Sequence, residues 1–451
     1  MSYGTVATRE PSGAVSLQIE VGAAPRRASF WAVAYMVLLG DSVRGIFFPT
    51  LWPLVSSLGG TRAHQGIIVA AFSLGRVLVS PWYGAHSTRH GYRGVLLFAH
   101  GVIVAGALLY TQVRGLASLF AAQVVLGLGC GTLGVTRAYV AESVPRDQRT
   151  VYLGRLTAMQ YAGLTTTSFL GSLLSRCGDG LAARYGGTRA GALLRLDGLT
   201  FAAYAVLAGA LAAVALLLAP TFVDFVPAAR PPAAAAAAGA APAPLAASDA
   251  AADRRHARLV AVGLVLNVVT KGSIGCYETL GVSYAQAELG LPGPVVGYYV
   301  SASGLVGVLF LLSFRPLGRL FDDVELVLYG IAVMVASCAL MVRPVAAALG
   351  GGDAFQVWLT ALFAMYAVGY PVGHTAVIGW FSKAMGRRPQ GMLMGLFASA
   401  GSLARIVFPV CTGLVAVSFG SDAVFATLAA LLGATLLIIA YFRAAFRGAI
   451  A

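Results

Sequence analysis

Ionisable side chains stand inside several of the long apolar segments of this sequence. Asp41 and Arg44 lie within LLGDSVRGIFF, and Lys271 and Glu278 lie within NVVTKGSIGCYETLG. Burying a charge away from water is costly unless an opposite charge or a ligand accompanies it. These segments therefore predict either charges that pair inside the protein or a site that handles a charged solute or protons.

Asp41 and Arg44 are three residues apart, so in a helix they share one face and can pair with each other. Two interpretations stay open at this point. The pair can lock neighbouring helices together as a structural element, or it can form a titratable site that lines a cavity.

The segment around Lys271 carries the largest number of polar groups. Lys271 follows Asn267 by four residues and Glu278 follows Lys271 by seven, which places all three near one stripe of a helix. Gly272 and Gly275 interrupt the segment, and glycine-broken membrane helices often line binding sites. We favour a functional site here; the alternative is a buried Lys–Glu pair that braces two helices.

Three more arginines occupy apolar segments. Glu142 follows Arg137 by five residues, about 140° around a helix, so we expect Arg137 to cap its own helix or to meet an acid on another one, with a gate as the functional alternative. Arg405 precedes a proline by four residues, so its guanidinium can satisfy the carbonyl that the proline leaves free. Arg76 has no partner in its own segment, so it can pair with Asp41 across a bundle or extend towards water.

The signs of these charges favour one kind of solute. Cations outnumber acids inside the apolar segments: Arg44, Arg76, Arg137, Lys271 and Arg405 against Asp41 and Glu278. A cavity with a net positive lining attracts anions and repels cations. We therefore assign Lys271, Arg44 and Arg405 as anion contacts and Asp41 and Glu278 as proton carriers.

The elements that carry these residues are long enough to cross a membrane. Hydrophobic residues make up 58% of the 451 residues and charged residues 11%, and a spanning helix needs about 20 apolar residues. The segments are too long for barrel strands. We predict an all-α membrane protein with twelve transmembrane helices at 30–58, 67–85, 95–112, 116–140, 156–174, 199–220, 259–285, 295–314, 326–342, 355–380, 391–418 and 423–442.

A low-complexity Ala/Pro-rich stretch divides these helices into two sets of six. We predict a cytoplasmic tail at 1–29, a six-helix half at 30–221, a cytoplasmic linker at 222–258, a second half at 259–442 and a cytoplasmic tail at 443–451. Two six-helix halves related by pseudo-symmetry are typical of secondary transporters.

The formal net charge of +14 does not indicate nucleic-acid binding, because most lysines and arginines fall in loops on one predicted side. That asymmetry places both termini in the cytoplasm. The cysteines form no metal-binding motif and no phosphate-binding loop is present, so we expect no metal, no cofactor and no enzymatic activity. The expected partners are the lipid bilayer, a small-molecule or inorganic anion and, as an option, protons; we expect a monomer.

Two loops at corresponding places in the halves share a glycine followed four residues later by Thr88 or Asp322, and the first of them resembles the loop signature of the major facilitator superfamily. The first runs from Gly84 through Arg89 and Gly91 to Arg93, with Thr88 where the family has an acid; the second contains Gly318 and Asp322. The resemblance implies that these residues belong to gating loops. The span-4 signature of the family appears with Gln123 in place of arginine, a departure that puts standard proton coupling in doubt.

Shorter stretches resemble one subgroup, the lysosomal ceroid-lipofuscinosis-type group (major facilitator superfamily domain-containing protein 8), and the membrane part of SPX-type vacuolar phosphate transporters. They are Arg137-Ala-Tyr139, Leu196-Asp197, Tyr277-Glu278-Thr279, Ser382-Lys383, Gln390-Gly391 and Ala404-Arg405-Ile406. The resemblance implies a lysosomal or vacuolar membrane, with the plasma membrane as the alternative, and anion conduction.

Three functions follow from these observations. We predict a secondary transporter that moves a small anionic solute by alternating access, with or without proton coupling. One alternative is a chloride-type anion channel on the same fold. The other is a membrane scaffold or sensor that moves nothing, in which all the buried charges would be paired internally.

Overall fold

The computed structural model describes residues 7–9, 15–17, 27–186, 188, 197–226, 245–312, 314–348, 350, 353–386 and 389–450. Within these ranges the chain is almost wholly helical. The exception is an antiparallel hairpin of β1 (Ala7–Arg9) and β2 (Val15–Leu17), which lies outside the helical bundle. The prediction of an all-α membrane fold is confirmed for the bundle.

The first half of the bundle precedes the central linker. Its helices are α1 (Arg27–Gly45), α2 (Phe48–Ser57), α3 (Arg62–His90), α4 (Tyr92–Thr111), α5 (Leu116–Gly129), α6 (Leu133–Ser143), α7 (Arg149–Tyr185) and α9 (Ala202–Leu218).

The second half follows the linker and contains two π-helical turns. Its elements are α10 (Leu245–Cys276), the turn Tyr277–Gly281, α11 (Val282–Ala287), α12 (Gly293–Leu312), α13 (Phe314–Leu320), α14 (Asp323–Leu340), α15 (Arg343–Ala348), α16 (Ala354–Phe363), the turn Ala364–Gly369, α17 (Tyr370–Ala384), α18 (Gly391–Tyr441) and α19 (Arg443–Gly448).

The all-α membrane fold is confirmed, whereas the count of twelve membrane-crossing segments stays a prediction. Ten stretches are long and apolar enough to span a membrane, and α7 and the shorter apolar α9 lie among them in the bundle. Gly420, with φ of 81°, breaks α18 between the predicted segments 391–418 and 423–442. α10 begins at Leu245, inside the predicted linker, whereas residues 227–244 lie outside the described residues.

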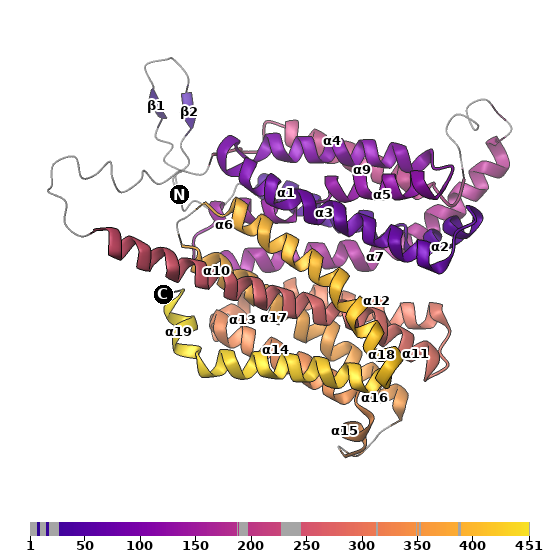
Figure 1. The fold of residues 1–451 in the computed structure, drawn as a ribbon. Coiled ribbons are helices and arrows are strands. Elements are labelled where there is room, and N and C mark those ends of the chain that lie inside the picture. The colour runs from indigo at the N-terminus through magenta and orange to yellow at the C-terminus, as the bar shows by residue number, and fades with distance from the viewer. Residues whose placement is uncertain are drawn as a thin grey trace.

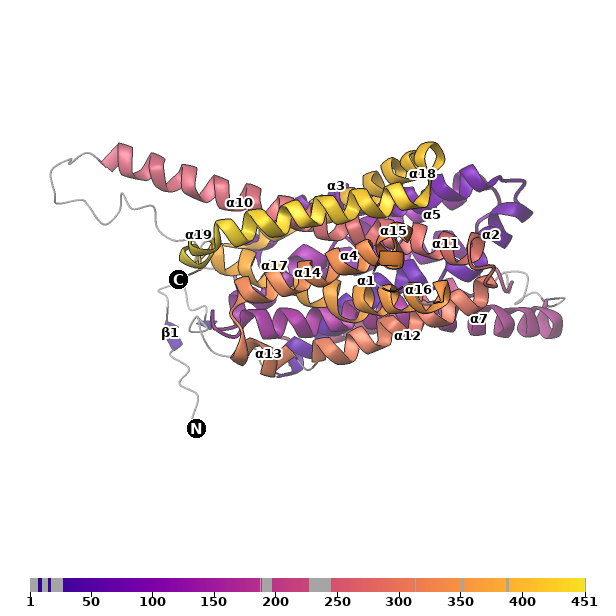
Figure 2. The same cartoon turned by 90° about the horizontal axis from the view of Figure 1, so that it is seen from below.

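The two halves lie side by side with their long helices roughly parallel (Figure 1). α3 and α6 pack on α18, and α7 packs on α12 and α17, so these helices form the interface between the halves. Figure 2 shows α7 running beside α12. α1 begins and α19 ends at the same end of the bundle, which we call the termini end.

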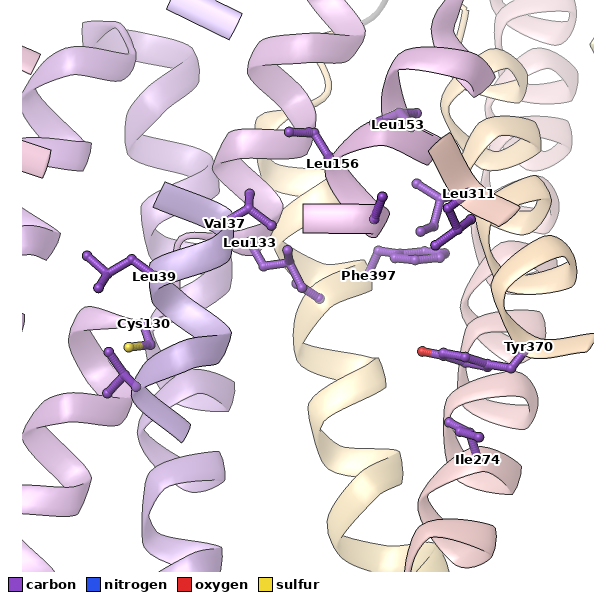
Figure 3. Close-up of a cluster of buried hydrophobic side chains, with 14 of the residues drawn as sticks. Val37, Leu39, Cys130, Leu133, Leu153, Leu156, Ile274, Leu311, Tyr370 and Phe397 are labelled. Atoms are coloured by element: carbon purple, nitrogen blue, oxygen red, sulfur yellow. The ribbon is translucent and has the colours of Figure 1, made fainter. Parts of the chain in front are cut away.

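Apolar side chains fill the interior of both halves. Figure 3 shows one buried cluster, which includes Val37 of α1, Leu156 of α7, Leu311 of α12 and Phe397 of α18. Because residues of both halves share this cluster, apolar packing continues across the interface.

Glycines allow the closest approach between the halves. Gly84 of α3 faces Gly391 of α18, and a Cβ atom on Gly84 would overlap the carbonyl of Gly391. Gly134 of α6 meets Gly395 of α18 in the same way. The small residues therefore bring helix backbones into contact at the termini end, as small residues commonly do between membrane helices.

Gly84→Ala should push α3 and α18 apart, because the added methyl group has no room beside the Gly391 carbonyl. Overpacking of this kind costs about 1–3 kcal/mol, so we expect a lower melting temperature in detergent. Gly94→Ala is the matched control, since a Cβ atom there would meet no atom within 4 Å. Equal melting temperatures for the two variants would contradict the tight contact.

Candidate functional site

Asp41 pairs with an arginine from another helix. Arg76 Nη1 of α3 lies 3.0 Å from Asp41 Oδ1 of α1, and both side chains are buried. The cross-bundle pairing considered for Arg76 is therefore correct, whereas the pairing of Asp41 with Arg44 along one helix is not realised. Within the described chain Arg44 has no hydrogen-bond or ion-pair partner; it lines a small cavity with Gln123.

Glu278 and Arg405 form a second ion pair, which is partly buried. Arg405 Nη2 of α18 lies 2.7 Å from Glu278 Oε1. This pair differs from two predicted contacts. Glu278 does not pair with Lys271, and the Arg405 guanidinium binds Glu278 instead of the carbonyl of Arg405 itself. Glu278 stands in the π-helical turn Tyr277–Gly281, and the wider turn shifts side chains away from the regular helical stripe. The stripe that the spacing predicted therefore ends before Glu278.

Lys271 is buried without a counter-ion. It is only 4% exposed, and no hydrogen bond or ion pair joins its ammonium group to another described residue. Gly401 of α18 makes room for it, because a Cβ atom there would lie 2.7 Å from Lys271 Cδ. The charges of Arg137, Arg405 and Asp41 all act on it. The lysine therefore stands in a predominantly cationic surrounding.

Arg137 is the third cation without an acidic partner in the described chain. Its Nη2 atom donates to Gln160 Oε1 of α7 at 3.0 Å, while its Nη1 atom has no partner in the described chain. It contacts neither the last carbonyls of its helix nor an acid, so both predicted partners are wrong. Gln160 was missed because a glutamine in an apolar segment carries no charge to mark it.

Other polar atoms near these cations are also unsatisfied. His374 Nδ1 lies 3.0 Å from Thr270 Oγ1, but His374 Nε2 has no partner among the described residues. The Oδ1 atom of Asn267 is likewise buried and unpaired, although its amide nitrogen donates to the Phe397 carbonyl. Buried polar groups are normally satisfied, so this cluster has capacity for a ligand or water.

The first loop signature forms the connection between α3 and α4. Gly91 has φ of 86°, a conformation that favours glycine. The backbone amides of Tyr92 and Arg93 both donate to Asp224, at 2.8 and 3.2 Å, and Arg93 also reaches the Phe222 carbonyl. Arg89 is exposed. These hydrogen bonds tie the loop to Phe222 and Asp224, which follow α9 in the chain.

The second loop signature caps α14. Asp322 accepts a hydrogen bond from the Glu325 amide at 2.8 Å and pairs with Arg447 at 2.6 Å. Gly318 approaches α7, since a Cβ atom there would lie 3.7 Å from Val151. The gating role of both loops remains a prediction.

Polar bonds between the halves gather at the termini end. The last turn of α6 contributes Glu142, whose carboxylate accepts from Tyr92 Oη at 2.5 Å and from the Gln390 amide at the start of α18 at 2.6 Å. Arg149 donates to the Ser382 carbonyl at 3.3 Å. The structure is thus closed at this end.

Two further bonds support the closure. Arg146 donates to the Lys383 carbonyl at 3.0 Å, and Thr150 donates to Asp323 at 2.9 Å. Asp323 also pairs with Lys383 at 2.7 Å within the second half. Arg146 and Thr150 of the first half therefore bond to groups at the end of α17 and at the start of α14 in the second half.

A helical membrane bundle in two halves, closed at one end and with buried cations that lack acidic partners in the described chain, is the architecture of a membrane transporter. The model of the Major Facilitator Superfamily matches residues 33–405. The chain belongs to this superfamily of multi-pass membrane transporters, whose members are not enzymes.

Individual relatives are distant. The chain is 27% identical to major facilitator superfamily domain-containing protein 8 of Xenopus laevis over 34% of its length, and the match spans 32% of that relative. It is 19% identical to the quinolone resistance protein NorA of Staphylococcus aureus (strain MRSA252), over 84% of this chain and 87% of NorA. The crystal structure of the human organic anion transporter MFSD10 superposes with a TM-score of 0.67 at 18% identity, covering 92% of this chain and 99% of that one.

Glu142→Gln should favour opening of the termini end. A glutamine side chain has one acceptor oxygen, so it cannot serve Tyr92 and Gln390 as the carboxylate does. Hydrogen bonds to charged groups contribute about 1.5–3 kcal/mol, enough to shift the population of closed molecules by tenfold or more. Spin labels at exposed Gln148 and Arg319 report the separation of the halves.

Asp224→Asn is the control for this measurement, because Asp224 binds amides of its own half only. We expect longer label distances in Glu142→Gln and an unchanged distribution in Asp224→Asn. Identical distributions in both variants and the unaltered chain would show that Glu142 does not hold the halves together.

Proposed function

We propose that the chain is a secondary transporter of a small anionic solute. One observation carries the proposal: Lys271 and Arg137 are buried near one another without an acidic partner. An uncompensated buried cation is strongly destabilising, and an anion that enters the site removes that cost. The relatives are named for different solutes, so the proposal of an anion rests on the positive charge of the site.

The two halves supply a route for alternating access. Lys271 belongs to α10 of the second half and Arg137 to α6 of the first, so an anion between them contacts both halves. The present conformation is closed at the termini end. In the proposed cycle the helix-end bonds of Glu142 and Arg149 break, the halves rock about the site, and the anion gains access to that side.

Proton coupling is the finer part of the proposal. Glu278 is the better of the two predicted carriers because its side chain is 24% exposed, whereas that of Asp41 is 4% exposed. Protonation of Glu278 would release Arg405 from its ion pair, and the freed guanidinium would become a further contact for the anion. Asp41 stays the second candidate proton carrier, and Arg44 stays a candidate anion contact.

The alternatives differ in what they need from the structure. A scaffold or sensor needs all buried charges paired, which Lys271 and Arg137 do not satisfy. A chloride-type channel needs a path open at both ends, which the bonds at the termini end do not favour. We further propose cytoplasmic termini, the domain limits given above, a monomer, and a lysosomal or vacuolar membrane as implied by the resemblance.

Lys271→Ala should reduce anion flux by about tenfold or more, because the loss of a buried charge contact of about 1.4 kcal/mol or greater gives that factor. Lys271→Arg should retain part of the flux, since the charge persists. Uptake of chloride, phosphate and organic acids into proteoliposomes measures the effect. Arg319→Ala, at an exposed cation of the termini end, is the control. Unchanged flux in a folded Lys271→Ala protein would refute the anion site.

Glu278→Gln should abolish accumulation driven by a pH gradient and preserve counterflow exchange, which needs no net proton movement. The amide cannot carry the proton, although it still offers an oxygen to Arg405. Asp41→Asn tests the second candidate in the same assay. Gradient-driven accumulation that persists in both single variants would exclude these two groups as proton carriers.

A further inference from the structure

A row of aromatic rings crosses the interface between the halves beside the central cations. The Tyr161 ring of α7 lies 5.7 Å from the Tyr370 ring of α17, centroid to centroid, at 33°. Tyr370 stacks on His374 at 4.9 Å and 10°. His374 in turn lies 6.4 Å from Phe397 of α18, at 26°. Figure 3 shows Tyr370 and Phe397 in the buried apolar cluster.

Tyr161 and Tyr370 form the one aromatic ring contact between the halves in the described part of the chain. Every other ring pair found there joins residues of the same half. Tyr370 is 2% exposed, and Tyr161 is partly buried. The contact therefore places two tilted aromatic rings at the interface, beside its aliphatic groups.

The same rings adjoin the cations that lack partners. The charges of Lys271 and Arg137 act on His374. The charges of the Arg405–Glu278 pair and of Arg137 act on Tyr370. His374 Nε2 and Arg137 Nη1 are unsatisfied donors or acceptors in this neighbourhood. Unpaired positive charge and stacked ring faces thus meet at one place, on both sides of the interface.

The aromatic rings and the cations are suited to bind different parts of the same ligand. Aromatic rings bind a further ring by offset stacking, at about 3.5 Å from each face. The free guanidinium nitrogen of Arg137 and the ammonium group of Lys271 suit a carboxylate. A ring held between Tyr161 and Tyr370 needs about 7 Å between two parallel faces. The two rings, now tilted by 33° with centroids 5.7 Å apart, must separate and align to admit it.

We propose that the solute is a planar aromatic carboxylate, with its ring between Tyr161 and Tyr370 and its carboxylate at Lys271 and Arg137. This substrate class rests on the proposed anion site and deepens it. The tyrosine pair closes the empty interface and opens to receive the ring. An aliphatic anion of the same charge lacks the stacking contribution and binds more weakly.

Benzoate and cyclohexanecarboxylate test the proposal, because they share one charge and one carbon count and differ in the planarity of the ring. Titration of the purified full-length chain, followed by its melting temperature, gives an apparent affinity for each. We expect benzoate to bind about tenfold more tightly, the factor that about 1.4 kcal/mol of stacking supplies.

Substitutions assign the preference to the two tyrosines. Tyr161→Leu and Tyr370→Leu should bring the ratio of affinities close to one, mainly by weakening benzoate. Tyr161→Phe and Tyr370→Phe should keep it, because the ring is retained. Tyr329→Leu, at an exposed tyrosine, is the control. The comparison of leucine with phenylalanine variants separates a stacking role from general loss of folding.

Equal affinities in the unaltered chain would overturn the proposal, as would a preference that survives both leucine substitutions. Binding or uptake of chloride or phosphate with no response to either carboxylate would overturn the aromatic class and leave the anion transporter in place. Failure of every anion to bind or move would overturn the anion transporter itself.

Discussion

The rest of the structure depends on how the bundle compensates buried positive charge. Of the five cations predicted in the apolar segments, two pair with an acid, and each pair lies within one half: Arg76 with Asp41 in the first, Arg405 with Glu278 in the second. An ion pair that stays within a half need not break when the halves move. The pairs therefore let each half act as a unit, and they leave Lys271 and Arg137 without acids at the surface where the halves meet.

The closed end is held by a different kind of bond. Glu142 and Arg149 reach across to backbone groups at the ends of α17 and α18, which are unsatisfied by their own helices. Water can replace the protein partner at such groups when the end opens, so opening leaves no buried polar atom without a partner. Ion pairs in the core could not be exchanged for water so easily. The core ion pairs lie within the halves and the hydrogen bonds to helix ends lie between them. This distribution suits a bundle whose halves move as units and can separate.

The sequence predicted the helices well and the partners of their charges poorly, for a physical reason. Segment length and hydropathy decide which residues cross a membrane, and a glycine such as Gly420 marks a break. Which helix lies next to Arg76 or Arg405 depends on packing between segments far apart in the chain. The π-helical turn that carries Glu278 also changes the helical register locally, so the predicted stripe with Lys271 failed. Neutral residues such as Gln160 and Tyr161 gave no signal at all.

The departure in the first loop signature has a compensating feature in the structure. Thr88 stands where the superfamily signature has an acid, and its hydroxyl donates to the Ala85 carbonyl of its own helix. The Glu142 carboxylate occupies the start of α18 instead, where it accepts the Gln390 amide. Helix N-termini carry partial positive charge, so one carboxylate there is favourable from whichever helix it comes. Because α6 also carries Arg137, the residue that seals the termini end and a cation of the central site are on one short rigid helix. If anion binding moves α6, the movement acts directly on the bond between Glu142 and Gln390 at the termini end.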